Sequence, residues 1–395
     1  MSGGGQSGGH PGGEPAPGRE RSDAAGQPAT GEAAAWRDAI ARPPASAAET
    51  SLAVGERVRR FALALLLTGL GFVLAVGALN AIVDPLGIVG TGLFPTKVMA
   101  DRQIKADLVA ALPEVPQVVI FGSSRAWKLN PEFIRAQTGL VTFNASVSGG
   151  RPADAWAFAN LIHDRIPAAR PNYIWILDVS ELSKVQLAAG LLNVPELRKY
   201  FPSGLVLRSR LKDVSSLFSF TTARDSLSIL RNLDAIRAKA ARQRRHWSTW
   251  GWFTDSTRDV KLDANPGLPN IQADIKDKSA IYRDYAGPDP QAKHYLEKTL
   301  ALFASWGGHG IIVIPPSEPG LITALMPVGW GERHQQVVDY LATLDTAYDF
   351  SVVDMTSLSS YGGSATGFID GVHLRTPEMN KMMAKVLEIA GHQLR

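Results

Sequence analysis

One apolar stretch, Phe61 to Val83, limits what this chain can fold into more than any other feature of the sequence. None of its residues carries a charge, and as a helix it would rise about 34 Å, against about 30 Å for the hydrocarbon core of a bilayer. A buried core helix is one alternative, but such helices are rarely this long and apolar on every side. A cleaved signal peptide is another, but its apolar region is shorter and follows a short leader. The sequence therefore predicts an uncleaved transmembrane anchor over residues 57–84.

Charged residues at the two ends of this stretch predict its orientation. Arg57, Arg59 and Arg60 precede it, whereas Asp84 follows it. Because loops rich in Lys and Arg stay on the cytoplasmic side, we expect a cytoplasmic N-terminus and an exported C-terminal part. In a bacterium, the chain would be a single-pass protein of the inner membrane with a periplasmic main domain. Export removes ATP and nicotinamide cofactors from the expected substrates.

The segment before the anchor, residues 1–56, is dominated by Gly, Ala, Pro and Ser. Such a composition cannot bury enough apolar surface to offset the entropy lost on ordering. We therefore predict a disordered cytoplasmic tail without chemistry of its own.

Composition and missing motifs exclude several classes of function. The chain has no cysteine, which rules out disulfides, cysteine nucleophiles and thiolate metal sites. Its net charge of +4 is too small to make nucleic acid the expected partner. There is no His-Glu-x-x-His motif, Asp-rich loop or Gly-x-x-x-x-Gly-Lys loop. Neither a metal nor another cofactor is therefore expected.

From Val115 onward, short apolar runs alternate with amphipathic stretches of helical period. Runs rich in Val, Ile and aromatic residues are typical of strands in a parallel sheet covered on both faces. The alternation predicts an α/β domain over residues 115–395, with a doubly wound, mostly parallel five-stranded sheet, after a connecting segment at 85–114. The expected strands are 115–122, 140–146, 173–180, 310–316 and 350–355, and the clearest helices are 131–137, 152–165, 294–306, 332–344 and 377–392.

A region of different pattern, residues 182–286, interrupts this alternation and is predicted to be an insertion over the sheet. A helix is expected near 226–245, followed by a patch that contains Trp247, Trp250 and Trp252. The favoured interpretation is that these aromatic side chains pack beneath a loop. The alternative is a surface for an acidic or sugar polymer, on which the three Trp rings pack against sugar rings and arginines at the end of the helix pair with carboxylates.

The end of the first predicted strand carries a candidate nucleophile. Ser123 and Ser124 follow Gly122 directly. A serine in a tight turn after a strand can project from the sheet, close to backbone N–H groups able to stabilise an oxyanion. Serine is also a common helix cap, which would explain the turn without any reaction.

Two further segments place polar groups next to expected element ends. Asp370 stands three positions before His373, a spacing at which a carboxylate can orient an imidazole base. Asn144 lies near the end of the second expected strand and Gly149 follows it, where glycine leaves backbone N–H donors uncovered. Each segment also fits a plain turn or helix cap. In doubly wound sheets, sites form outside the carboxyl ends of the strands, which is where these residues are expected.

In this order, a strand-end Gly-Ser-Ser, a glycine-bearing second loop and a C-terminal Asp-x-x-His resemble the SGNH/GDSL hydrolase superfamily. The resemblance covers residues 115–395. The Gly-Ser-Ser form is similar to membrane-anchored members that act in cell-envelope acyl transfer, such as proteins of alginate O-acetylation. The resemblance implies that Ser124 is the nucleophile, His373 the general base and Asp370 the residue that orients the base. It also implies oxyanion donors at the backbone N–H groups of Ser124 and Gly149.

One position departs from this family. Where the family brings an asparagine side chain to the oxyanion after the third strand, this chain has Asp178. An unpaired carboxylate there would repel the oxyanion, so we expect Asp178 to pair with Arg125. Ser123, Ser180 or Asn144 could replace the missing donor. Loss of one such donor costs about 10²–10³ in rate, so weak hydrolysis with retained transfer is expected.

Together with these patterns, the resemblance implies a membrane-anchored, serine-dependent O-acyltransferase or esterase acting on an extracytoplasmic glycan, with acetyl as the expected acyl group. A transferase needs an acyl donor from across the membrane, which implies a multi-spanning membrane O-acyltransferase as partner. Two alternatives remain. One is a plain esterase. The other is a non-catalytic glycan-binding or assembly subunit, which the missing asparagine and the Trp-rich patch favour.

Overall fold

The computed structural model describes residues 47–97, 101–184, 187, 189–254 and 267–395. The chain divides into a first unit that ends at Gly69 and a second unit from Leu70 to Arg395. The described part of the first unit is helical and belongs to α2 (Ala47–Val83). Most of the predicted disordered tail, residues 1–46, lies outside the described residues.

Among the described helices, α2 alone is long and apolar enough to cross a membrane. The candidate span is Thr50–Val83, with a mean hydropathy of 2.4 in its most apolar part. The helix begins at Ala47, so residues 47–56, the described part of the segment predicted as a tail, are helical. Ala, Leu and Glu in this segment favour helix, and extension of an existing helix avoids the cost of nucleation.

A five-stranded sheet forms the centre of the second unit, and all its strand pairs are parallel. The prediction of a five-stranded α/β sheet is confirmed, and every strand falls within its expected run or begins one residue earlier. The strand order is β2-β1-β3-β4-β5, with β1 Val118–Gly122, β2 Thr142–Asn144, β3 Asn172–Ile176, β4 Gly310–Ile314 and β5 Phe350–Asp354.

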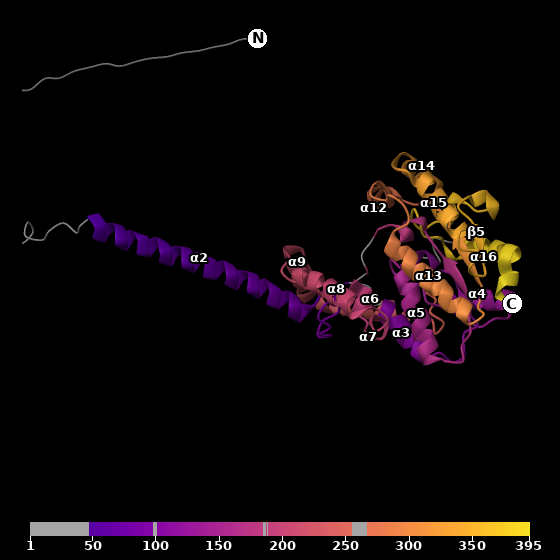
Figure 1. Ribbon diagram of the computed structural model, residues 1–395, viewed down its shortest axis with the longest axis horizontal. Helices are drawn as coiled ribbons and strands as arrows, with labels where there is room; N and C mark the ends of the chain where they lie inside the picture. Colours follow the sequence, from indigo (N-terminus) through magenta and orange to yellow (C-terminus); the bar gives the residue numbers. More distant parts are fainter. Residues whose placement is uncertain (1–46, 98–100, 185–186, 188, 255–266) are drawn as a thin grey trace, which may run out of the picture. The chain divides into compact units, whose positions relative to one another are not determined.

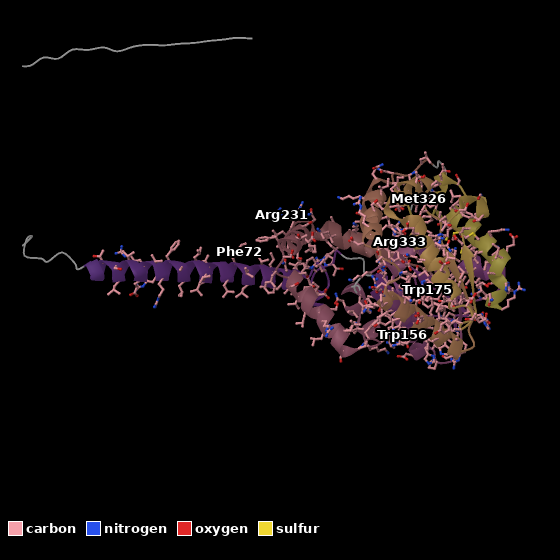
Figure 2. All side chains as sticks on the ribbon, turned by 45° about the horizontal axis from the view of Figure 1, so that its top comes forward. Phe72, Trp156, Trp175, Arg231, Met326 and Arg333 are labelled. Carbon is pink, nitrogen blue, oxygen red and sulfur yellow. The ribbon has the colours of Figure 1, made fainter. Side chains whose placement is uncertain are left out.

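The central strands are buried on both faces, which explains their nearly continuous apolar sequence. In β1, Val119 and Phe121 face one core and Val118 and Ile120 face the other. Trp175 of β3 lies in the first core (Figure 2). The helices over the first core include α5 and α13, which lie side by side (Figure 1). The first core is covered by α3 (Asp101–Ala110), α5 (Pro152–Arg165), α13 (Pro290–Ser305) and α15 (Trp330–Ala342), and the second by α4 (Pro131–Thr138) and α16 (Thr376–Ala390).

The region between β3 and β4 is mainly helical where it is described. The single helix expected near 226–245 is in fact two helices, because Asn232 leaves the helical conformation and ends the first of them. Residues 255–266 of the predicted insertion lie outside the described residues. The helices here are α6 (Ala189–Leu192), α7 (Pro195–Arg198), α8 (Ser203–Ser216), α9 (Phe220–Arg231), α10 (Leu233–Arg245) and α12 (Gln272–Arg283), and α14 (Pro319–Leu325) follows β4.

Candidate active site

The strand order makes the carboxyl ends of β1 and β3 the expected place of a site. The chain passes from β1 to β2 on one side and from β3 to β4 on the other, so its direction reverses between these two neighbours. In open α/β sheets, ligands bind outside the carboxyl ends of the strands at such a reversal. Ser124 follows β1 and Asp178 follows β3. Both predicted site residues therefore lie at this edge.

Ser124 is half-buried at the start of the 3₁₀ turn η1 (Ser124–Ala126). Gly122 makes this turn possible. Its φ is +141°, and a Cβ there would lie 2.6 Å from the carbonyl oxygen of Ile176 in β3, a position that only glycine tolerates. Ser123 caps the turn, because its Oγ accepts a hydrogen bond from Arg125 N at 3.4 Å. The capping role that was an alternative for this serine pair therefore belongs to Ser123.

The side chains of Ser124, His373 and Asp370 form one hydrogen-bonded series. Ser124 Oγ lies 2.7 Å from His373 Nε2, although the two residues are 249 positions apart. His373 Nδ1 lies 2.7 Å from Asp370 Oδ2. When Nδ1 donates its proton to the carboxylate, Nε2 is left to accept the proton of the serine hydroxyl. This arrangement can produce a serine nucleophile.

The loop around Asp370 fixes the position of its carboxylate. Asp370 Oδ1 accepts hydrogen bonds from the backbone N–H groups of Val372 and His373, both at 2.9 Å. Ile369 N donates to the His373 carbonyl oxygen at 2.8 Å, which closes the loop into a tight hairpin. Burial on its own raises the pKa of Asp370, but the hydrogen bond and charge of His373 and the two backbone N–H groups lower it to about 2. Asp370 is therefore ionised at neutral pH and favours the Nδ1–H form of His373.

The loop after β2 packs against the strand end that carries Ser124. Val147 N donates to the Gly122 carbonyl oxygen at 3.2 Å, and a Cβ on Gly150 would approach the same oxygen to 2.3 Å. Across the described ranges, the backbone N–H groups of Ser124 and Gly149 donate no hydrogen bond to the protein. These two uncommitted N–H donors therefore lie on the turn after β1 and on the loop after β2, which pack together at Gly122.

Asn144 is committed to holding these segments together. Its side-chain amide donates to the carbonyl oxygens of Ala126 and Leu129, both at 2.9 Å. Its Oδ1 accepts hydrogen bonds from Ser146 N at 3.0 Å and Ser146 Oγ at 2.6 Å. Because both amide hydrogens are already donated, the expectation that Asn144 could replace the missing oxyanion donor is wrong. Asn144 instead ties the segment after Ser124 to β2.

Asp178 pairs with Arg125, as predicted. The Arg125 guanidinium donates to its carboxylate, and Lys278 Nζ of α12 lies 3.7 Å from the other carboxylate oxygen. Burial on its own raises the pKa of Asp178, but the charges of Lys278 and Arg125 and the hydrogen bond from Ser180 keep it below the ordinary value. The negative charge of Asp178 is thus balanced by two cations before any oxyanion forms.

Ser180 is also committed elsewhere. Its hydroxyl donates to the Asp178 carboxylate and accepts a hydrogen bond from Lys278 Nζ at 2.8 Å. The single hydroxyl hydrogen of Ser180 is therefore in use, and the expectation that Ser180 could donate to the oxyanion is wrong. Of the three proposed substitutes, Ser123 is left, and its hydroxyl also acts on the carboxyl group of Glu181.

A buried acid that no sequence motif marks, Glu181, lies beside Ser123. Glu181 is 4% exposed, and within the described residues neither of its carboxyl oxygens makes a hydrogen bond of normal geometry. Burial, and then the charge of Asp178, raises the pKa of Glu181 to about 8, against the opposing effects of the Ser123 hydroxyl and the Arg151 charge. Glu181 is therefore mainly protonated at neutral pH.

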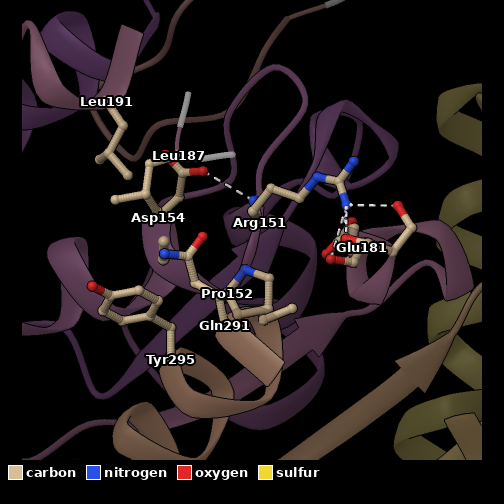
Figure 3. Close-up of a pocket in the computed structure, with 11 residues that line it drawn as sticks. Arg151, Pro152, Asp154, Glu181, Leu187, Leu191, Gln291 and Tyr295 are labelled. Atoms are coloured by element: carbon tan, nitrogen blue, oxygen red, sulfur yellow. Dashed lines mark hydrogen bonds between the residues drawn. The ribbon is translucent and has the colours of Figure 1, made fainter. Parts of the chain in front are cut away.

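Glu181 and Arg151 line a small hollow of about 20 Å³, which has room for one water molecule (Figure 3). Arg151 Nη1 donates to the carbonyl oxygens of Ser180 at 2.7 Å and Glu181 at 3.0 Å, while its backbone N–H donates to Asp154 at 2.9 Å. Arg151 therefore joins the loop after β2 to the 3₁₀ turn after β3. No motif marks this pair, because it exists only once these two loops have packed.

The aromatic patch of the insertion packs behind the Ser124 turn. Trp247 is 8% exposed, and its ring meets Trp127 edge-on at 5.6 Å between centroids. Lys105 Nζ lies 4.6 Å from the centroid of the same ring. Phe253 N donates to the Trp127 carbonyl oxygen at 3.2 Å. The favoured interpretation, aromatic residues packed beneath a loop, is confirmed for Trp247, and its predicted sugar-stacking role is wrong because the ring is already covered.

The remaining Trp residues of the patch stand closer to solvent. Trp250 and Trp252 are half-buried. The backbone between them docks on β2, since Asn144 N donates to the Trp250 carbonyl oxygen at 2.9 Å and a Cβ on Gly251 would approach Asn144 O to 2.2 Å. Contact of Trp250 and Trp252 with a sugar stays a prediction.

Within the described ranges, no group of three or more His, Asp or Glu side chains is arranged to hold a metal ion. The sequence matches no protein-family model and no curated protein. The geometry of the site therefore carries the functional conclusion.

Proposed function

We propose that this chain is a membrane-anchored, SGNH-like acyl-transfer enzyme that moves an acyl group to or from an extracytoplasmic glycan through Ser124. One observation carries the proposal: Ser124 Oγ, the His373 ring and the Asp370 carboxylate are joined by two contacts of 2.7 Å at the carboxyl edge of a parallel sheet. A nucleophile, a base and an acid that orients the base, at these distances, serve serine acyl transfer on several unrelated folds.

The proposed reaction has two halves. In the first, Ser124 Oγ attacks the carbonyl carbon of the acyl donor while its proton passes to His373 Nε2. The donor oxygen leaves with that proton, and an acyl ester on Ser124 remains. In the second half, an acceptor hydroxyl gives its proton to His373 Nε2 and attacks the ester. Ser124 then leaves and recovers the proton.

The uncommitted N–H groups of Ser124 and Gly149 are the proposed oxyanion donors. Asp178 does not oppose them strongly, because Arg125 and Lys278 balance its charge. An asparagine donor is absent from this site, so attack by loosely held water should be slow. An acceptor hydroxyl that the protein positions gains the advantage of orientation, which favours transfer over hydrolysis.

The acceptor and the partner belong to the same proposal. The helix α2 supports a membrane anchor by its length and composition. With the sheet domain outside the cytoplasm, the acceptor would be an envelope glycan, and the acyl group would arrive through a multi-spanning membrane O-acyltransferase. Acetyl is the acyl group we propose to test first.

A non-catalytic glycan-binding subunit is the second candidate. The lack of an asparagine at Asp178 favours it. Burial of Trp247 weakens it, because one of the three rings that would stack on a sugar is unavailable. This candidate predicts that Ser124→Ala leaves glycan binding intact and that Trp250→Ala weakens it.

The decisive experiment treats the full-length protein with an activated acetyl ester and follows both ester turnover and the intact mass. The wild-type protein should gain one acetyl group, and Ser124→Ala should not. Ser123→Ala tests which of the two hydroxyls is acylated: it leaves the contact between Ser124 and His373, although it removes the turn cap and can slow the reaction. It should still carry the adduct.

The outcomes separate the candidates. An adduct on Ser124 that an oligosaccharide removes faster than water identifies a transferase, and removal at the same rate identifies an esterase. No adduct on the wild-type protein, with identical traces for Ser124→Ala, would overturn the proposal and favour the binding subunit.

A further inference from the structure

Two neighbouring helices, α8 and α9, expose large apolar side chains. Spacings of three and four residues place these side chains along one face of each helix. Phe220, at the start of α9, is 73% exposed. Large exposed apolar side chains that gather on two consecutive helices are a candidate interaction surface. The exposed set includes Leu207, Leu211 and Val214 of α8, Phe218 in the turn that follows, and Phe220 and Leu227 of α9.

The turn between α8 and α9 packs along the last turns of α2. Phe218 lies so close to Gly77 that a Cβ on Gly77 would be 2.5 Å from its ring. The rings of Phe220 and Phe72 are 6.1 Å apart between centroids, and Phe72 is labelled in Figure 2. Phe72 precedes the end of α2 at Val83 by about 16 Å along the helix axis. We call α8, α9 and the turn between them the α8–α9 hairpin; its turn packs against residues 72–80, an apolar part of α2.

Asn80 interrupts the apolar sequence of α2, and the hairpin satisfies its side chain. Asn80 Nδ2 donates to the Leu217 carbonyl oxygen at 2.5 Å, and its Oδ1 accepts a hydrogen bond from Ser226 Oγ at 2.8 Å. Asn80 is fully buried. Hydrocarbon surroundings require such pairing, since no water is present there to replace a missing partner.

The outer face of α9 combines apolar and basic residues. Phe220, Arg224, Leu227 and Arg231 follow one another at intervals of three or four residues and line a hollow of about 420 Å³ (Figure 2 labels Arg231). Helices with this composition lie in the membrane interface, where apolar side chains enter the acyl-chain region and arginine side chains reach up to the phosphates. The mixed face fits lipid better than it fits a purely apolar protein partner.

We propose that the α8–α9 hairpin is a second membrane-contacting element, embedded in the leaflet at the Val83 end of α2. Its apolar residues lie among the acyl chains, and Arg224 and Arg231 lie at the phosphates of anionic lipids. The occupant of the apolar face is therefore lipid rather than a second copy of this chain or another protein. The inference requires that α2 spans the membrane, and it does not depend on the chemistry of Ser124.

The absence of cysteine from the chain makes a direct test practical. Single cysteines are introduced by Leu211→Cys and Phe220→Cys in the hairpin, Leu65→Cys in the span and Ile389→Cys on α16. Each full-length protein is placed in liposomes of phosphatidylcholine and phosphatidylglycerol and treated with a membrane-impermeant maleimide. Ile389 is 50% exposed and serves as the matched control on the sheet domain. Labelling in detergent after unfolding corrects for intrinsic reactivity.

The hairpin cysteines should react at least about tenfold more slowly than Ile389→Cys, as expected for side chains buried below the headgroups. This protection should persist when the protein is diluted with lipid. Reaction as fast as that of Ile389→Cys, or an unprotected Leu65→Cys, overturns the proposal. Protection that disappears on dilution identifies a second copy as the occupant. Protection in native membranes but not in liposomes identifies a protein partner. Each of these last two results also overturns the proposal.

Discussion

The contact between Ser124 and His373 distinguishes this histidine from a second one that also pairs with a carboxylate. His334 Nε2 lies 2.8 Å from Asp354 Oδ2, so that nitrogen is already engaged. His373 instead directs Nε2 to a serine hydroxyl at 2.7 Å. His373→Gln should therefore slow acetylation of Ser124 by about 10²–10⁴, whereas His334→Gln should not. Stopped-flow measurement of the initial burst compares the acetylation rates of the two variants. An equal loss of rate in both would argue against His373 as the base.

Glu181 should make the free energy of unfolding fall as the pH rises. Its folded-state pKa of about 8 lies above the ordinary value of 4.5. The stability that comes from burying the neutral acid is therefore complete below about pH 4 and is lost as the pH rises through about 8. The side chain of Glu181→Gln cannot ionise, so the free energy of unfolding of this variant should rise relative to that of the wild type between about pH 5 and pH 8. The gain should reach at least about 1 kcal/mol, since one pKa unit is worth about 1.4 kcal/mol. Urea unfolding of both proteins at each pH measures this gain. A stability difference between the two proteins that does not change with pH would contradict the raised pKa of Glu181.

At the residue scale, the sequence predicts what local spacing determines and misses what packing determines. Asp370 and His373 are three positions apart, and Ser124 follows a strand end, so all three are visible in the sequence. Their contact could only be inferred from the shared edge of the sheet. The direction in which Asn144 donates its amide hydrogens, and the protonation of Glu181, depend on neighbours that no spacing reveals.

At the element scale, Gly150 should be the least replaceable position of the loop after β2. A Cβ there would approach the Gly122 carbonyl oxygen to 2.3 Å, and backbone cannot move aside as a side chain can. Gly150→Ala should lower the free energy of unfolding by about 1–3 kcal/mol. It should also slow acetylation of Ser124, because the adjoining N–H of Gly149 would shift. Gly391→Ala is the control, since the nearest side-chain atom lies at 3.6 Å and its φ is −62°. Chemical unfolding and burst kinetics on both variants test this, and equal stability would show that the loop can relax.

Strands buried on both faces were predicted well, and elements whose limits depend on contacts with neighbouring segments were not. The strands are recognisable because both faces are buried, which leaves nearly continuous apolar sequence. Residues 47–56 of the predicted tail are helical, and composition does not reveal this because the helix propagates from the adjoining apolar segment. The break at Asn232 and the docking of Gly251 on β2 arise from single backbone positions within otherwise ordinary sequence.

At the scale of the whole molecule, the stretch from Asn80 to Gly90 joins the candidate anchor to the rest of the second unit. Asp84 ends α2 with a φ of +49°, and its carboxylate accepts backbone hydrogen bonds from Ile88 at 2.7 Å and Gly90 at 2.6 Å. Lys97 Nζ then pairs with Asp225 of α9 at 2.6 Å. The sequence identifies the candidate span by its hydropathy, but the pairing of this stretch with helices more than a hundred residues away requires the folded structure.

Asn80 allows the role of this joint to be measured. Its hydrogen bonds to Leu217 and Ser226 link α2 to the hairpin, and both would be lost in Asn80→Leu. Amide hydrogen exchange in the full-length variant should therefore become faster in α8 and α9, while β1 stays protected because its hydrogen bonds lie inside the sheet. Thr68→Leu, at an exposed position of the same helix, should leave both regions unchanged. If exchange rises equally in β1 and α9, the hairpin and the sheet unfold as one unit. If it rises in neither, the hairpin is held by its aromatic contacts at Gly77 and Phe72 rather than by Asn80.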